Sequence, residues 1–544
     1  MVREESVLIT AQNLGGILMS LWERLFGKKD EDIDTNFGET KVYGSLDKNF
    51  KAIKDILVDC DDVLYREIKI GVEGNYRAVI ISIDGMTDKD ILNDYVLKNL
   101  MINSRIAPPD IGILKRHISD VIKDKTLSAA EMKEIKTIEQ AVEDILIGDT
   151  VLILDNYDKI IVIGTKGWEK RGVTEPETEN VVRGPREGFI ETLRVNTTMI
   201  RRRIRDHKLK IKGYQIGKRS KTDVSVLYIE DLVDEDVLKE LDKRLRAIDI
   251  DAIIDSGYIE QFIEDDWRSI FPQVQNTERP DVAAAALYEG RAVIVVDNSP
   301  FVLIIPSGFN AMVQSAEDYY ERWGIATFLR ILRYISLLVS LYTPALYIAV
   351  TAFHPQMLPA KLLISIAANR TGVPFPSVLE AVIMEIILEI LREAGVRLPG
   401  PIGQTIGIVG AIVIGQAAVD AGIVGSIMII VVSITAIASF ATPSFNLAAG
   451  VRLLRFGLII ASAILGLYGI MLVTILILIH LCSLKSFGVP YLTPYTAYVK
   501  QHSDLKDTFI RAPWPTMRDR ETTVKKSERK RMRDYRDEDL NKEE

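Results

Sequence analysis

The stretch from Gly400 to Phe445 constrains the fold more than any other, because it holds two apolar segments of bilayer length that are almost free of charge. Its first half carries small residues at every fourth position, namely Gly403, Gly407, Ala411 and Gly415. On a helix these residues share one face, along which a second helix can approach closely. The spacing predicts tight helix packing in a membrane, either inside one subunit or between the subunits of an oligomer.

Charge divides the 544-residue chain into three parts. Charged and apolar residues are mixed from Met1 to about Arg330, apolar residues dominate from Ile331 to about Leu484, and the remainder is polar and finally charge-dense. The net charge of −8 averages over these parts, so it gives no support for a nucleic-acid partner. Two cysteines are typical of a reduced, cytosolic soluble region. Glu4 and Glu5 stand where a secretory signal would be basic, so no such signal is expected.

The apolar part contains four clear segments long enough to cross a bilayer, at roughly 20 residues per span. They are Ile331–Phe353, Ile402–Val419, Ile423–Ala441 and Phe456–Leu481. Arg330 and Arg333 flank the first of them, which places the soluble region in the cytoplasm. Four crossings return the chain to the cytoplasm at Lys485, in agreement with the basic tail that runs from Lys525 to Asp534.

A helix predicted from Ser377 to Ala394 lies between the first two spans and carries Glu385 and Glu389 on one face, followed by Arg392. A full crossing by this helix would give five spans and put the basic tail outside, so a re-entrant or amphipathic helix is favoured. Ionisable groups at membrane depth cost about 2.5 to 3.5 kcal/mol each. Glu385, Glu389 and Asp420 are therefore candidates for a water-lined ion path. The alternative is an interfacial helix with paired carboxylates.

The soluble region contains an internal duplication. Tyr76–Leu100 matches Thr222–Leu245, and Glu143–Asn156 matches Ala284–Asn298, with Gly148 aligned on Gly290. Because each copy alternates strand-like and helix-like stretches, we expect two related α/β subdomains in tandem, followed by an α-helical polytopic membrane domain. The expected domains are an N-terminal extension with an amphipathic helix (1–44), two cytosolic α/β subdomains (45–175 and 176–320), a transmembrane domain (321–484) and a partly disordered cytosolic tail of mixed charge (485–544).

A basic cluster follows the linker between the two subdomains. It consists of Arg201, Arg202, Arg203 and Arg205. These side chains are suited to pairing with acidic helices of a neighbour, to binding an anion or to contacting anionic lipid. A solvated or intramolecularly paired face is the alternative.

The sequence contains no catalytic signature. The nearest match to a phosphate-binding loop, GYQIGKR from Gly213, is one residue short and has Arg219 where a metal-binding Ser or Thr would stand. The five histidines are scattered along the chain. We therefore expect neither enzymatic activity nor a metal or cofactor, and an enzyme hidden in the α/β region is the minor alternative.

Several long strings resemble one known family in the same order. They include VRGPREGFIETLRVNTTMIRRRI, RPDVAAAALYEGRAVIVVDNSPFVLIIPS and EDYYERWGIATFLRILRYISLLVSLYTPALYIAVTAFHPQMLP. From about Ser45 to about Pro494 the chain resembles the A-subunit family of bacterial spore germinant receptors. The resemblance implies a spore inner-membrane protein that works with a nutrient-sensing, transporter-like B subunit and a lipoprotein C subunit. It also implies that A subunits form oligomers and a cation channel.

The sequence thus predicts a non-enzymatic membrane subunit of a nutrient-responsive germination receptor. In this interpretation the chain oligomerises and forms or gates a cation channel. One alternative is a non-conducting scaffold subunit of the same complex. Another is a related, stage-specific spore membrane protein without a nutrient specificity of its own.

Overall fold

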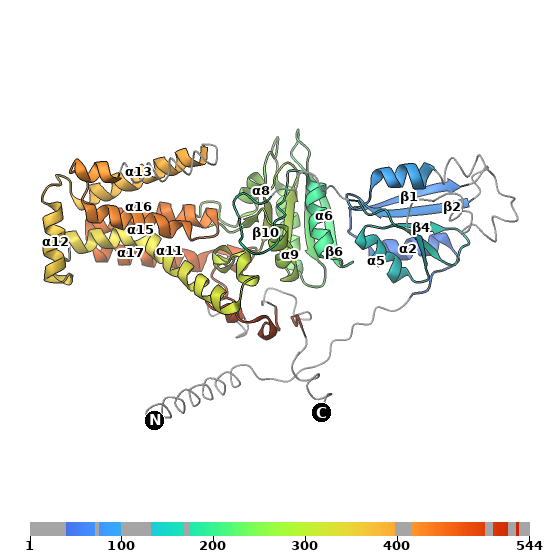
Figure 1. The fold of residues 1–544 in the computed structure, drawn as a ribbon. Coiled ribbons are helices and arrows are strands. Elements are labelled where there is room, and N and C mark those ends of the chain that lie inside the picture. The colour runs from blue at the N-terminus through green and yellow to red at the C-terminus, as the bar shows by residue number, and fades with distance from the viewer. Residues whose placement is uncertain are drawn as a thin grey trace, which may run out of the picture.

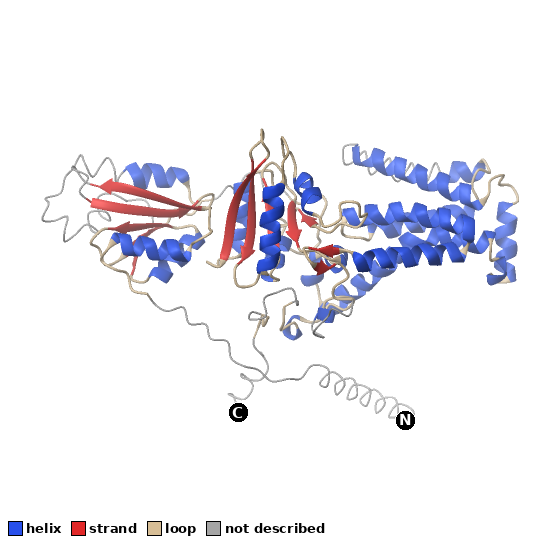
Figure 2. Cartoon of the chain, turned by 180° about the vertical axis from the view of Figure 1, so that it is seen from behind, coloured by secondary structure: helices blue, strands red, loops and turns tan. Residues whose placement is uncertain are grey.

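The computed structural model describes residues 40–70, 76–98, 132–167, 175–397, 415–495, 504–520 and 529–532. Two sheet-containing subdomains and a bundle of helices follow one another along one axis (Figure 1). All strands of the two large sheets come before residue 306, and the described residues of the apolar part are mainly helical (Figure 2). The predicted N-terminal amphipathic helix lies outside the described residues.

The first subdomain is a five-stranded antiparallel sheet in the order β1-β2-β4-β5-β3. Its elements are α2 (Leu46–Ile56), β1 (Val63–Ile70), β2 (Tyr76–Ile83), the π-helix η1 (Ile91–Leu97), β3 (Met132–Ile135), α5 (Ile138–Ile147), β4 (Thr150–Leu154) and β5 (Ile160–Ile163). Every residue of β4 and β5 is buried, which explains their continuous β-branched and leucine runs. Helices α2 and α5 cover one face of the sheet, and η1 packs on the other.

The second subdomain repeats this arrangement, with the strand order β6-β7-β9-β10-β8. Its elements are α6 (Leu193–Arg203), β6 (Leu209–Ile216), β7 (Thr222–Ile229), α7 (Glu235–Ala247), α8 (Ser256–Ile263), β8 (Gln275–Thr277), α9 (Pro280–Tyr288), β9 (Ala292–Val296), β10 (Val302–Ile305), α10 (Phe309–Val313) and the 3-10 helix η4 (Ala316–Tyr319). Helices α6 and α9 cover one face, and α7 and α8 cover the other. Asp234 and Asp255 cap α7 and α8 through their side chains.

The turns of the two subdomains also correspond. Gly148 after α5 and Gly290 after α9 both have positive φ, at 101° and 71°. Asn156 after β4 and Asn298 after β9 are likewise left-handed, at 58° and 67°. Glycine and asparagine tolerate this conformation best, so the residues that match in the sequence are the ones that the repeated turns require.

A short backbone pairing joins the two sheets. The loop before β1 adds to the edge of the second sheet at β6, with Cys60 opposite Ile211. The amide of Asp61 donates to the Ile211 carbonyl at 2.9 Å, and the amide of Ile211 donates to the Asp59 carbonyl at 3.0 Å. The otherwise open edge of β6 is therefore partly covered.

The helical part consists of α11 (Trp323–Ala352), the 3-10 helix η5 (Pro355–Met357), α12 (Ala360–Arg370), α13 (Ser377–Arg397), α15 (Ser426–Phe440), α16 (Phe445–Leu465) and α17 (Leu467–Ser483). Among the described helices, α11 and α16 are long and apolar enough to cross a membrane, and α15 and α17 are shorter apolar helices. The predicted span Ile423–Ala441 corresponds to α15, whereas most of Ile402–Val419 lies outside the described residues.

The prediction of one span from Phe456 to Leu481 is wrong. The chain reverses at Gly466 (φ 60°, ψ −136°), and α16 and α17 form an antiparallel hairpin that packs on α11. A Cβ atom at Gly466 would come within 2.9 Å of the Phe353 Cβ, so the turn needs both the conformation and the small size of glycine. An unbroken apolar pattern hid this turn, because a glycine inside such a run also fits a continuous helix.

Helix α13 corresponds to the helix predicted from Ser377 to Ala394, and it is not among the described helices that are long and apolar enough to cross a membrane. It runs beside α15, from Glu380 near Gly425 at one end to Arg392 near Ser439 at the other. Its buried residues join α11, α15 and α16 in one core. The helix therefore extends beside α15 (Figure 1), and its re-entrant or amphipathic placement in a membrane stays a prediction.

The described parts of the C-terminal segment, which was expected as a partly disordered tail, pack back onto the second subdomain. They form β11 (Lys485–Ser486), β12 (Val489–Pro490) and the 3-10 helices η6 (Asp504–Lys506) and η7 (Trp514–Thr516). Thr508 and Arg511 are buried there. Arg511 also lies over the rings of Tyr319 and Trp514, so aromatic packing holds this polar segment in place.

Candidate functional site in the helical bundle and at its base

A buried ion pair connects three helices inside the bundle. Glu385 on α13 accepts from Arg455 on α16, with 2.6 Å between Oε2 and Nη1, and both side chains are 2% exposed. The Nη2 of Arg455 also donates to Ser340 Oγ on α11 at 3.1 Å. Glu385 Oε1 and Arg455 Nε have no hydrogen-bond partner among the described residues. The pair is therefore close but not fully satisfied.

A second carboxylate lies one helical turn further along α13. Glu389 pairs with Arg392 on the same helix at 2.9 Å and with Arg452 on α16 at 3.1 Å. Arg392 also donates to Ser439 Oγ on α15 at 3.3 Å. With Glu385 and Arg455, the cluster holds three guanidinium groups against two carboxylates, so its formal charge is +1. Both predicted carboxylates are thus neutralised by arginines.

Sequence reasoning missed Arg452 and Arg455, because it began the last span at Phe456. The helix actually begins at Phe445, so both arginines lie within it. Their spacing of three residues in a helical, apolar stretch puts them on one face, and this is the signal that could have found them.

Asp420 does not join the cluster. Its carboxylate is exposed and accepts from Gln416 Nε2 at 3.0 Å. Gly415 is buried, and a Cβ atom there would lie 3.7 Å from the Ile429 side chain of α15, so this end of the small-residue face packs inside the chain. Gly403, Gly407 and Ala411 lie outside the described residues. Another buried carboxylate, Glu380, lies near the start of α13 and accepts from the Gly425 amide at 2.9 Å.

Ion pairs hold the N-terminal part of α11 in place. Asp318 of η4 accepts from Arg333 at 2.6 Å and from Arg330 at 3.2 Å. Arg330, whose side chain is 0% exposed, also pairs with Asp507 of the C-terminal segment at 2.7 Å. Asp507 in turn accepts from the Tyr319 hydroxyl at 2.5 Å. The arginines that flank the first span therefore join α11, the second subdomain and the C-terminal segment.

The bases of α16 and α17 are held by the same subdomain. Ser269 Oγ is 2.9 Å from His480 Nε2 on α17. The hairpin that follows α17 inserts Phe487 into the core of the second subdomain, where the Arg244 guanidinium lies 4.5 Å from its ring centroid. The second subdomain thus touches three of the helices near their ends.

The basic cluster on α6 is engaged within the chain. Arg201 is completely buried and forms a bidentate pair with Asp62 of the first subdomain, at 2.8 and 3.0 Å. Arg202 and Arg203 both contact Glu187, at 3.5 and 2.7 Å. Arg205 is exposed. Arg201, Arg202 and Arg203 therefore form ion pairs within the chain, as the alternative of an intramolecularly paired face predicted, and they do not form an open anion site.

The near-match to a phosphate loop has the wrong surroundings. Residues from Gly213 to Ile216 belong to β6, and the following turn leads into the antiparallel strand β7 instead of a helix. No helix N-terminus is therefore offered to a phosphate at this point. Within the described ranges, no group of three or more His, Cys, Asp or Glu residues is arranged to hold a metal ion.

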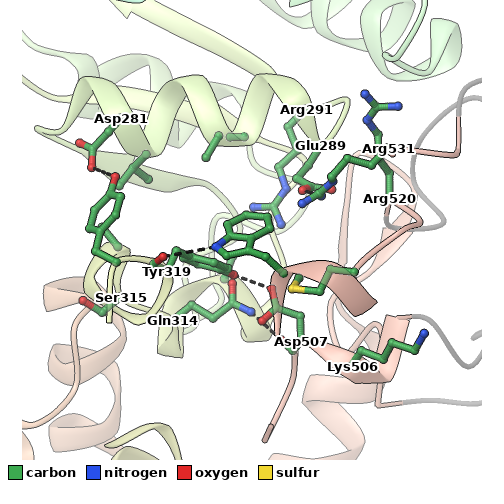
Figure 3. A pocket seen from close by; sticks show the side chains of 18 of the residues that line it. Asp281, Glu289, Arg291, Gln314, Ser315, Tyr319, Lys506, Asp507, Arg520 and Arg531 are labelled. Atoms are coloured by element: carbon green, nitrogen blue, oxygen red, sulfur yellow. Dashed lines mark hydrogen bonds and ion pairs between the residues drawn. The ribbon is translucent and has the colours of Figure 1, made fainter. Parts of the chain in front are cut away.

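Two hollows adjoin the base of the bundle. One, of about 240 Å³, lies between α9, η4 and the C-terminal segment, and Figure 3 shows Asp281, Glu289, Arg291, Tyr319 and Asp507 around it. The carboxylate of Glu289 pairs with Arg531 there. Its walls therefore come from parts of the chain that are far apart in sequence.

The other hollow, of about 660 Å³, separates the second subdomain from the turn between α15 and α16. Glu260 of α8 lines it. Burial of this carboxyl, helped by the nearby charges of Glu264 and Asp255, raises the pKa of Glu260 to about 7.

Comparison with known proteins gives consistent matches. A family model described as Bacillus/Clostridium GerA spore germination protein matches residues 51–523. Spore germination protein KA of Bacillus subtilis (strain 168) is 45% identical over 488 residues, which cover 90% of this chain and 88% of that protein. Spore germination protein GerLA of Bacillus cereus is 42% identical over 499 residues, which cover 90% and 99%. The crystal structure of the N-terminal domain of the A subunit of the Bacillus megaterium spore germinant receptor GerK3 is 32% identical and covers 50% of this chain and 98% of that chain, with a TM-score of 0.39.

Proposed function

The chain belongs to the Bacillus/Clostridium GerA family of spore germination proteins, as its sequence strings indicated, and we propose that it is the A subunit of a nutrient-responsive germination receptor. It works with a transporter-like B subunit and a lipoprotein C subunit. It lies in the spore inner membrane as a multi-pass protein, with its N-terminal region and C-terminal tail in the cytosol. Copies of the chain oligomerise and form or gate a cation path.

The cluster around Glu385 carries this proposal. A carboxylate in the membrane attracts cations only when no closer positive group neutralises it. In the described conformation Arg455 neutralises Glu385 at 2.6 Å, and the cluster as a whole carries an excess positive charge. Such a cluster repels cations, so it represents a closed state. Opening requires α13 and α16 to separate enough to part Glu385 from Arg455.

The base of the bundle supplies the route by which a signal reaches the cluster. Arg330 at the base of α11 is held by Asp318 and Asp507, and Ser340 further along the same helix bonds Arg455. A shift of the second subdomain against the membrane therefore acts on the hydrogen bond between Ser340 and Arg455. This is a small rearrangement between two packed states, of the kind that tightly packed helices allow.

Cation flux through the reconstituted receptor tests the proposal. The A, B and C subunits are placed in liposomes, and flux is followed with and without nutrient. We expect Glu385→Gln to abolish the nutrient-evoked flux. Arg455→Gln leaves a buried carboxylate without its partner, so it should raise the flux without nutrient. Glu380→Gln, which changes a buried carboxylate of the same helix that pairs with Arg370 at 3.3 Å and lies outside the cluster, is the matched control and should conduct normally.

A non-conducting scaffold is the second candidate, and the neutralisation of both Glu385 and Glu389 by arginines favours it. Replacing a buried ion pair by neutral groups is often harmless to a fold, whereas removing one partner costs about 3 to 5 kcal/mol. The double variant Glu385→Gln, Arg455→Gln separates the two functions. Assembly with normal germination and unaltered flux would contradict a role of the pair in conduction and support the scaffold.

A further inference from the structure

Large apolar side chains lie exposed in and around helix α8 of the second subdomain. We call them the interfacial surface, and they are Ile254, Tyr258, Phe262, Trp267 and Ile270. Tyr258 and Phe262 are four residues apart on α8 and share an exposed face, about 100° around the helix from Ile259 and Ile263, which are buried against the sheet. Trp267, in the loop after α8, is 70% exposed. A soluble surface rarely leaves so many aromatic residues together in water.

The position of this surface indicates what covers it. Helix α8 lies on the side of β10 that is nearer to the bundle (Figure 1). The carbonyl oxygen of Ile270 lies 2.7 Å from the position of a Cβ atom on Gly450, and Ser269 contacts His480. Gly450 is five residues inside α16, or about 7.5 Å along its axis. The loop that carries Trp267 therefore lies beside the first turns of α16 and the last turn of α17.

The loop also carries polar and charged residues. The Arg268 guanidinium lies 5.0 Å from the centroid of the Trp267 ring and places a cation beside it. Two carboxylates flank these residues, but both are engaged by the protein. Asp265 accepts from Arg244 at 2.6 Å and from the Phe487 amide at 2.7 Å, and Asp266 accepts from the Arg268 amide at 3.1 Å. The loop thus exposes Trp267, Arg268 and Ile270, beside an Asp265 carboxylate that is paired with Arg244.

We propose that the interfacial surface rests in the headgroup layer of the membrane and holds the second subdomain against the lipid. Tryptophan and tyrosine favour this layer, because their rings are apolar and their N–H or O–H groups remain near water. Arginine pairs with lipid phosphates at the same depth. The proposal rests on the membrane placement of the bundle given above and is independent of ion conduction.

Tryptophan fluorescence in lipid nanodiscs tests this contact. In the full-length chain, the other four tryptophans are changed to Phe, which leaves Trp267 as the only emitter. The nanodiscs contain phosphatidylcholine and phosphatidylglycerol, with or without bromine on the upper part of the acyl chains. We expect brominated lipid to cause a loss of Trp267 emission, and iodide in the water to have little effect.

Two control variants make each outcome decisive. Ile475→Trp, on the exposed face of α17, reports whether the bundle lies in lipid, and a variant that keeps only Trp514 reports on the water-facing C-terminal segment. If Ile475→Trp is quenched by bromine while Trp267 is quenched by iodide alone, the membrane placement stands and the interfacial contact is overturned. If neither reagent quenches Trp267, a protein surface covers it, and the lipid contact is equally overturned.

Discussion

Arg201 and Arg205 are four residues apart in one basic cluster and have opposite environments. Arg201 is completely buried and reaches across to Asp62 of the first subdomain, whereas Arg205 is exposed. The Nη1 of Arg201 also donates to the Leu209 carbonyl at the start of β6. The Arg201 side chain therefore binds both the first subdomain, through Asp62, and strand β6, with which the loop before β1 is paired.

We predict that Arg201→Ala weakens the joint between the two subdomains by about 3 to 5 kcal/mol, because it leaves the Asp62 carboxylate buried without a partner. Amide hydrogen exchange across residues 205–216 of the full chain measures this change, since the Ile211 amide donates across the joint. Arg205→Ala is the control and should alter local stability by less than about 0.5 kcal/mol. Equal exchange rates in the two variants would show that the ion pair does not hold the joint.

Glu260 predicts a pH dependence of stability. The pKa of this group is about 7 in the folded chain and 4.5 in its ordinary state, so folding favours the protonated form. The stability that it contributes is complete below about pH 4.5 and is lost as the pH rises through 7. Glu260→Gln should therefore raise the unfolding temperature at pH 8 and leave it nearly unchanged at pH 4.5. Asp251→Asn, at an exposed position, should show no such difference. A constant offset at all pH values would contradict the assignment.

At the scale of elements, the C-terminal segment behaves as a strap across the base of α11. Asp507 contributes through its side chain to Arg330 and Tyr319, and its carbonyl accepts from Asn310 and Gln314 at 3.2 and 2.7 Å. Composition predicted a polar cytosolic tail here. It could not show that the polar groups find partners on α10 and η4, because those partners lie almost 200 positions earlier in the chain.

We predict that Asp507→Asn loosens this strap. Arg330 would keep Asp318 but lose a charged acceptor, and a hydrogen bond between charged groups contributes about 1.5 to 3 kcal/mol. Limited trypsin digestion of the full chain in detergent should then cut faster after Lys506 and Arg511. Asp236→Asn, on the exposed face of α7, should leave the digestion pattern unchanged. Unaltered cleavage in Asp507→Asn would mean that the backbone contacts alone hold the segment.

The elements that the sequence predicted best are those whose patterns repeat. The duplicated strings anticipated the paired turns at Gly148 and Gly290, because each turn requires the same residue for the same backbone reason. The apolar part was harder. Hydropathy measures only how apolar a stretch is, so it joined α16 and α17 into one span and placed Arg455 outside it. The partners of Glu385 then stayed hidden, since they depend on where the helix begins.

For the whole molecule, the hairpin at Gly466 changes the expected membrane topology. If α16 and α17 both cross, the turn lies on the side of the membrane opposite the two sheet-containing subdomains. Cys482 near the end of α17 would lie on their side. A single span from Phe456 to Leu481 would instead bury the turn in hydrocarbon.

We predict that Tyr468→Cys, at an exposed position beside the turn, reacts with a membrane-impermeant maleimide added to the outside of cells. Cys482, exposed in the same chain, should react only after the membrane is opened. The Tyr468→Cys variant is made with Cys482→Ser, so that each site is read alone. If the cysteine of Tyr468→Cys reacted with maleimide from neither side of the membrane, the result would support a single span from Phe456 to Leu481.

The second subdomain meets the membrane helices at three places: the base of α11, the ends of α16 and α17, and the hairpin that carries Phe487. Because the three contact sites are separate, the subdomain cannot rotate about one of them without straining the other two. We therefore expect a tilt of this subdomain to reach the bundle as a displacement of α11 relative to α16. Ser340 lies ten residues, about 15 Å, beyond Arg330 on a rigid helix, and so it receives this displacement directly. Arg455 bonds both Ser340 and Glu385, so we expect its hydrogen bonds to be the first that this displacement changes.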